Sequence, residues 1–156
     1  MFAIDTNILV YAHNKDSEFN QDATEFLEKV MNERNDEGSL TICLPSQVLM
    51  EFVNVITRKT LQSPLLLSEA INVIQDYLAT DIQIINQRET QIQTFIELLS
   101  SVTTRKKIFD VALAATLKDN DISGLYTVNV DDFKNFEFLT VTNPLAKEQG
   151  EGAPDQ

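Results

Sequence analysis

The chain is poor in the residues that build disulfides and zinc sites. It contains one cysteine, Cys43, one histidine, His13, and no tryptophan. A single cysteine excludes an internal disulfide and fits a reducing compartment. One histidine and one cysteine also exclude a zinc site built from several such ligands, and any mechanism that needs two histidines. We expect His13 to be a surface residue.

Basic residues and long apolar runs are scarce as well. Twelve Lys and Arg face 24 Asp and Glu, a formal charge of −12. Phosphate binding normally depends on Lys and Arg, so this balance is unfavourable for a nucleic-acid protein. The excess serves solubility, unless some of the acids converge and need cations. No run reaches the length of a membrane span, and the start MFAIDTN lacks a basic signal-peptide region, so we expect a cytoplasmic protein.

Apolar patterning predicts one α/β domain over residues 1–145 and a disordered polar tail over 146–156. Strands alternate with helices, which favours a mostly parallel sheet covered on both faces, with ligands bound beyond the carboxyl ends of the strands. The expected strands are 2–5, 40–44, 81–85, 124–128 and 136–141. The expected helices are 16–35, 46–59, one capped by Ser68 and Glu69, one carrying Ile92 to Leu99, and one capped by Thr103 or Thr104.

Acidic residues interrupt apolar context at several points. Asp5 follows the first strand, Glu51 shares a helix face with apolar neighbours, and Asp110 opens an almost wholly apolar helix. Asp131 and Asp132 follow the strand GLYTV. Each has a structural alternative: a helix cap, a surface ion pair, a favourable charge at a helix N-terminus, or an ordinary turn. Their conjunction favours one shared site.

Carboxylates in one site need a cation between them, because like charges raise each other's pKa and destabilise the fold. Oxygen ligands without His or Cys suit Mg²⁺ or Mn²⁺. Mg²⁺ keeps several waters and leaves positions for phosphate oxygens. The residues therefore indicate metal-assisted phosphoryl chemistry.

Four segments in this order resemble the PIN domain, and most closely the VapC-type toxins of toxin–antitoxin systems. They are DTNILVYA, MEFVNVITRK, FDVALAATL and LYTVNVDDF. The resemblance implies a three-layer α/β/α sandwich with a central, mostly parallel sheet. It also implies an endoribonuclease dependent on Mg²⁺ or Mn²⁺, a homodimer, and a small antitoxin whose segment enters the acidic site.

The resemblance assigns roles residue by residue. Asp5, Glu51 and Asp110 match the three best-defined acids of the family. The fourth is less settled: we predict Asp132, with Asn129 as a polar ligand or water-holder, while Asp131 stays solvated.

Contacts with RNA are predicted from few residues. Thr6 matches a small hydroxyl residue of the family and could contact a metal-bound water. Lys107 stands where the family more often has Arg, and it lacks the planar guanidinium fork. Arg58, Lys106 and Lys107 could line a groove that grips phosphates; the alternative is a solvated loop.

Two rival functions use the same residues. A catalytically silent PIN-like module would bind only a protein partner, but such a module would be expected to lose one or more of the acids. A phosphatase-like hydrolase with an aspartyl nucleophile commonly carries a second Asp two residues later, where this chain has Asn7.

Overall fold

The computed structural model of the chain describes residues 1–102 and 108–147. Its strands are β1 (Phe2–Ile4), β2 (Ile42–Pro45), β3 (Gln83–Ile85), β4 (Gly124–Tyr126) and β5 (Thr140–Thr142). Its helices are α1 (Thr6–His13), α2 (Asn20–Asn32), α3 (Ser46–Ile56), α4 (Leu67–Leu78), α5 (Gln91–Leu99), α6 (Ile108–Asp119) and α7 (Val130–Phe133).

The sheet is parallel at every pairing between these strands, in the order β3-β2-β1-β4-β5. The strands are short, and the central ones are apolar throughout because helices cover both of their faces. β1 and β4 approach closely at Gly124, where an added Cβ would lie 2.6 Å from the ring of Phe2. The chain first runs outward from β1 to β3 and then returns to β4, so the switch point of the sheet lies between β1 and β4.

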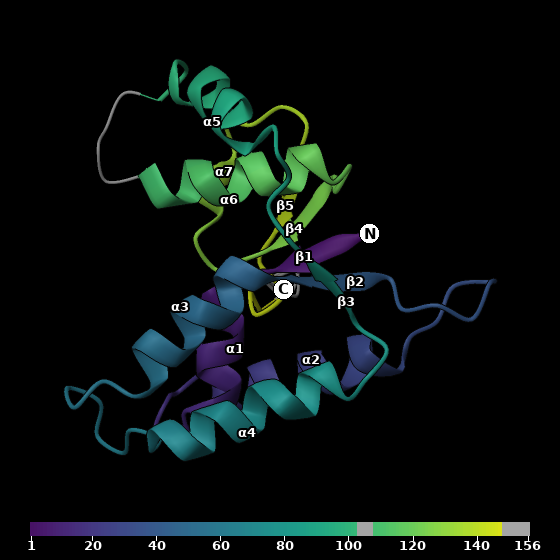
Figure 1. The fold of residues 1–156 in the computed structure, drawn as a ribbon. Helices are drawn as coiled ribbons and strands as arrows, with labels where there is room; N and C mark the ends of the chain where they lie inside the picture. Colours follow the sequence, from purple (N-terminus) through teal and green to yellow (C-terminus); the bar gives the residue numbers. More distant parts are fainter. Residues whose placement is uncertain (103–107, 148–156) are drawn as a thin grey trace, which may run out of the picture.

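Helices lie on both faces of the sheet. Figure 1 shows α1 to α4 on one face and α5 to α7 on the other, which is the arrangement expected of right-handed crossovers in this strand order. Within these layers α1 packs against α2 and α3, α3 against α4, and α5 against α6. The predicted three-layer α/β/α sandwich is confirmed.

The core explains why α6 is apolar on nearly all sides. Val111, Leu113, Ala114 and Leu117 are buried along this helix. The first turn of this helix begins at the half-buried Ile108. Asp110 lies in that turn, half-buried at the margin of the core.

Several predicted boundaries were wrong. The helix expected over 16–35 spans only Asn20–Asn32, because the side chain of Asn14 accepts a hydrogen bond from the backbone of Asp16 and the chain turns before the helix. Residues 136–139, expected in the last strand, form hydrogen-bonded turns, and β5 begins at Thr140. Ser68 is not the cap of α4: Glu69 accepts a hydrogen bond from the backbone of Leu66, one residue before the helix.

His13 is not a surface residue. It is half-buried, its Nε2 lies 2.9 Å from the hydroxyl of Tyr77, and its ring packs edge-on against Phe52. Burial lowers its pKa, while the charge of Asp76 acts in the opposite direction.

Some predictions fall outside the described residues. They concern the cap at Thr103 or Thr104, the side chains of Lys106 and Lys107, and the tail beyond Lys147. In the parts that are described, no helix has the length and hydropathy needed to cross a membrane.

Candidate acidic site

The switch point of the sheet is occupied by a buried acid. Asp5 follows β1 directly, and its backbone N–H donates to the carbonyl of Tyr126 at the end of β4 (2.9 Å). Its Oδ1 accepts from the backbone N–H of Thr6 (2.8 Å), so Asp5 is also the N-cap of α1. Its Oδ2 accepts from the hydroxyl of Thr127 (2.7 Å), which follows β4. The predicted cap alternative is therefore correct for Asp5, and the carboxylate is held between two neighbouring strands.

Asp5 is only 7 % exposed, and its pKa is raised. Burial is the main cause, and the negative charge of Glu51 acts in the same direction. Hydrogen bonds from Thr127, the Thr6 backbone and Asn7 lower the pKa without offsetting the burial. The charged form of Asp5 is thus under-compensated by the protein, which is the condition in which a carboxylate gains most from a cation.

Glu51 is connected to Asp5 through one side chain. The hydroxyl of Thr6 donates to Oε2 of Glu51 (2.8 Å), while its backbone N–H serves Asp5. Gln47, one turn earlier in α3, donates from Nε2 to Oε1 of Glu51 (3.1 Å) and to the carbonyl oxygen of Phe109 (3.1 Å). This network links α1, α3 and the first turn of α6.

Asp5, Thr6 and Glu51 line a cavity of about 320 Å³, which we call the acidic cavity. Its lining residues come from Asp5 after β1, from α1, α3 and α6, and from the segment after β4. Five predicted site residues meet there. The described lining is Asp5, Thr6, Asn7, Val10, Tyr11, Glu51, Val55, Asp110 and Asn129.

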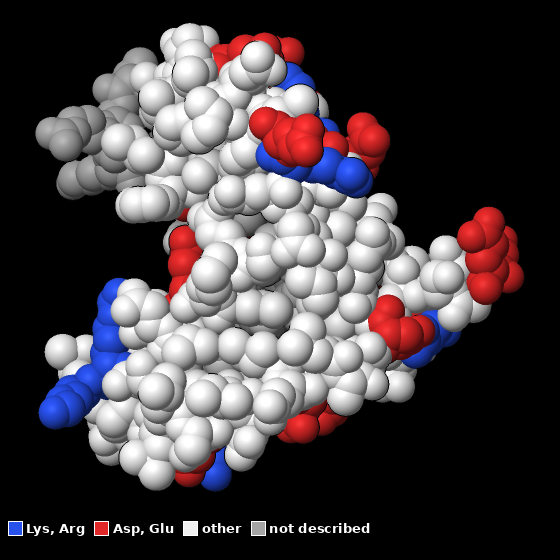
Figure 2. All heavy atoms as spheres, in the orientation of Figure 1, with Lys and Arg blue, Asp and Glu red and all other residues white. Residues whose placement is uncertain are grey.

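Other predicted residues lie elsewhere. Asp132 is half-buried in the short α7, which begins directly after Asn129, but it is not among the described residues that line the acidic cavity. Asp131 is exposed and pairs with Lys134 (3.1 Å). Arg58 is exposed and lines an adjoining cavity that also includes Thr6 and Glu51. Figure 2 shows Asp and Glu atoms inside the indentation between the two helix layers, and Lys and Arg atoms on its lower lip.

The donor set fits a hard cation. The acidic cavity offers the carboxylates of Asp5, Glu51 and Asp110 and no histidine or cysteine among its described lining. Within the two described stretches, no group of three or more His, Cys, Asp or Glu side chains is close enough to hold a metal as it stands. Mg²⁺ does not require one, because it takes one or two carboxylates and completes its shell with water and phosphate oxygens.

Sequence reasoning assigned no role to three residues that order this site. Thr127 is fully buried and contacts Asp5. The side-chain amide of Asn7 donates to Oδ2 of Asp5 (3.4 Å) and to Oγ1 of Thr127 (3.2 Å). Gln47 connects α3 to α6 through its hydrogen bond to the carbonyl oxygen of Phe109. For Thr127 the signal was its place directly after the carboxyl end of β4, and for Asn7 its place in the first turn of the helix that follows β1. For Gln47 it was the i, i+4 spacing to Glu51.

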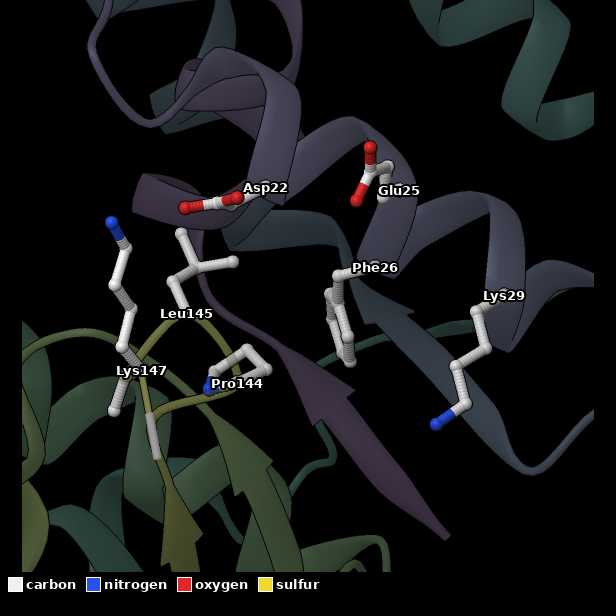
Figure 3. A pocket seen from close by; sticks show the side chains of 8 residues that line it. Asp22, Glu25, Phe26, Lys29, Pro144, Leu145 and Lys147 are labelled. Atoms are coloured by element: carbon white, nitrogen blue, oxygen red, sulfur yellow. The ribbon is translucent and has the colours of Figure 1, made fainter. Parts of the chain in front are cut away.

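A further cavity, of about 360 Å³, lies between α2 and residues 144–147 (Figure 3). Asp22 and Glu25 lie along it together with Lys29 and Lys147, so both signs of charge are present. None of its described lining residues belongs to the acidic cavity. We assign it no chemistry.

The doubly wound sheet and the acidic cavity at its switch point define a small α/β protein with an acid site. The chain belongs to the PIN domain family, whose model matches residues 2–139. It is 27 % identical over 150 residues to Ribonuclease VapC24 of Mycobacterium tuberculosis, covering 95 % of this chain and 99 % of that protein. It is 30 % identical over 148 residues to Ribonuclease VapC43 of the same organism, covering 93 % and 96 %.

A solved structure has the same fold. The chain superposes on a protein of a toxin–antitoxin complex from Klebsiella pneumoniae with a TM-score of 0.62, at 17 % identity, covering 92 % of this chain and 98 % of that one. The agreement extends over nearly the whole length of both chains. The resemblance noted in the sequence is thereby confirmed at the level of family and fold.

Proposed function

We propose that this protein is a metal-dependent endoribonuclease and the toxin of a toxin–antitoxin pair. The observation that carries the proposal is the meeting of three carboxylates, from the residue after β1, from α3 and from α6, in one cavity at the switch point of the sheet. The relatives named ribonucleases support RNA as the substrate class. Membership of the PIN domain family supports phosphodiester hydrolysis as the reaction.

Asp5, Glu51 and Asp110 would hold Mg²⁺ or Mn²⁺, with Asp132 as the proposed fourth acid. Such an ion, when bound, supplies an activated water at neutral pH and neutralises charge on the phosphodiester. Thr127 and the Thr6 backbone fix the two oxygens of Asp5, and the Thr6 hydroxyl with Gln47 fixes those of Glu51. These hydrogen bonds orient both carboxylates before substrate arrives.

Substrate contacts fall to residues at the rim. Asn129 is exposed where it lines the acidic cavity, so its amide is available to a water or a phosphate oxygen. Arg58 makes no ion pair within the described residues, which leaves its guanidinium available to a phosphate. Lys106 and Lys107 directly precede α6, and we assign them the same role from their position in the chain.

The proposed protein partner is a small antitoxin. The structural relative from Klebsiella pneumoniae is described as a toxin–antitoxin complex, which supports such a partner for this chain. An acidic cavity is suited to a basic side chain of an antitoxin segment, which would occupy the position of the cation. A cytoplasmic location and a homodimer stay predictions.

The phosphatase alternative commonly uses a second Asp two residues after the nucleophile, here Asp5. That position holds Asn7, whose side-chain amide donates hydrogen bonds to Asp5 and Thr127.

The test is cleavage of structured and single-stranded RNAs with Mg²⁺, with Mn²⁺ and with EDTA. The site variant is Asp5→Asn, and the matched control is Asp131→Asn, which removes the same charge from an exposed ion pair. We expect cleavage by the wild type and the control, none by Asp5→Asn, and none in EDTA. Calorimetry should also show weaker Mn²⁺ binding by Asp5→Asn. Cleavage that survives EDTA, or full activity of Asp5→Asn, would overturn the proposal.

A further inference from the structure

A second cavity, of about 530 Å³, opens beside the acidic cavity; we refer to it as the adjoining cavity. Thr6, Glu51 and Val55 line both, so the two spaces meet at Glu51, one of the proposed cation ligands. A chain bound with its phosphodiester at the carboxylates would therefore place a neighbouring group in the adjoining cavity. Its described lining is Thr6, Glu51, Asn54, Val55, Arg58 and Phe109.

One side of the adjoining cavity comes from a single face of α3. Glu51, Asn54, Val55 and Arg58 are spaced at i, i+3, i+4 and i+7, and a hydrogen bond from the Arg58 backbone to Val55 extends the turn past the end of the helix. This face carries an amide with two donors and an acceptor, a methyl surface and a guanidinium. Those groups match the edge of a nucleobase and the phosphate beside it, whereas a purely apolar ligand would leave them without partners.

Phe109 supplies an aromatic ring to the same cavity from α6. The side chain is 75 % exposed, which is unusual for a phenylalanine in a helix that is largely buried. Its backbone is not loose, because Gln47 of α3 donates a hydrogen bond to its carbonyl oxygen. The ring is therefore displayed to solvent from a fixed point, immediately before Asp110.

We propose that the adjoining cavity is a nucleobase subsite, in which an unpaired base of the RNA stacks on Phe109 while Asn54 contacts the base edge and Arg58 the adjacent phosphate. The inference rests on the proposed ribonuclease function and adds the position at which a base is held. Stacking of an RNA base on an exposed aromatic ring is the usual way in which proteins bind single strands, and it tolerates different bases. The subsite thus selects unpaired nucleotides next to the cleaved bond.

The experiment measures RNA binding in the Asp5→Asn background, in which the RNA stays intact. The probes are a short single-stranded RNA and versions of it that carry one abasic nucleotide at successive positions. Phe109→Ala should weaken binding of the intact RNA about fivefold or more. An abasic nucleotide at one position should weaken binding to the parent protein by the same factor, with little further loss in Phe109→Ala. Phe109→Tyr should retain affinity.

The matched control is Met50→Ala on α3, which removes a side chain that is 66 % exposed and does not line either cavity, and it should bind RNA like the parent. Phe109→Ala should melt at the parent's temperature, because the ring is mostly exposed. Equal affinity of Phe109→Ala and its parent, or an equal loss with every abasic RNA, overturns the subsite. If either result is obtained while the wild-type protein cleaves RNA, only the proposed subsite is wrong. If the wild-type protein cleaves no RNA, the proposed function fails and the subsite with it.

Discussion

The hydroxyl of Thr127 should be among the most costly single groups to remove from this protein. It is fully buried, donates to Oδ2 of Asp5, and accepts from Asn7 (3.2 Å) and from the backbone N–H of Asn129 (3.1 Å). Thr127→Val preserves the shape of the side chain and removes all three interactions. The change therefore isolates the polar contribution from any cavity effect.

The expected loss follows from the type of each bond. A hydrogen bond to a charged acceptor contributes about 1.5–3 kcal/mol, and a buried donor left without an acceptor costs about 1–3 kcal/mol. Asn7 still has Asp5 as an acceptor, so the total is about 2–4 kcal/mol rather than the full sum. For a chain of this size that is roughly 5–15 °C in melting temperature.

Urea and thermal unfolding of metal-free protein measure the effect. Thr116→Val is the matched control: Thr116 is equally buried in α6, but its hydroxyl donates to the neutral oxygens of Gln91 and Ala112 and should cost only about 1 kcal/mol. A double-mutant cycle of Thr127→Val with Asp5→Asn should show coupling of about 1.5 kcal/mol or more. Equal losses for the two Val variants together with no coupling would refute the reasoning.

Three further predictions address other parts of the site and the fold. Gln47→Leu removes the bridge between Glu51 and Phe109 and should slow RNA cleavage about 10- to 100-fold while Met50→Ala does not, since misplacement of a reacting group is costly; an unchanged rate would dismiss the bridge. Metal-free Asp110→Asn should melt at or above the wild-type temperature because it removes one of the three carboxylates that line the acidic cavity, and a marked drop would instead make Asp110 a structural residue. Because burial lowers the pKa of folded-state His13 below its unfolded value of about 6.5, its contribution to stability is complete above that pH and is lost as pH falls from there through the lower folded-state pKa. Wild-type melting temperature should therefore fall more steeply than that of His13→Gln between about pH 7 and 5, and parallel curves would contradict this.

The order of elements could be predicted because alternating apolar strands and helices are a strong local signal. The exact first and last residues of these elements could not be predicted, because local polar contacts and aromatic packing decide them. Phe136 belongs to an apolar run that is typical of a strand, yet it packs its ring near Phe133 and Phe138 in a turn. His13 lies at the end of α1, and Tyr77, which is distant in sequence, reaches it because α4 packs against α3.

The acids of the site could be found because a carboxylate in apolar context is unusual. The groups that orient them could not be ranked from the sequence, because threonine, asparagine and glutamine are common in turns and on helix surfaces. Thr127 reaches Asp5 across 122 positions of sequence, and Gln47 reaches Phe109 across 62. Contacts of this kind exist only once β4 is paired with β1 and α6 is packed on the opposite face.

Among the described residues, Asp5 and Glu51 differ from the ion-paired acids in the nature of their partners. Asp81 pairs with Arg34, whose hydrogen bonds lower its pKa, and Asp131 pairs with Lys134. Asp5 receives its hydrogen bonds from Thr127, Thr6 and Asn7, all neutral donors, and its pKa is raised. Neutral donors fix the direction of a carboxylate without cancelling its charge, whereas an arginine at the same position would compete with any bound cation. The protein thus orients Asp5 and leaves its charge to be met from outside, which is what a cation-binding carboxylate requires and a structural ion pair does not.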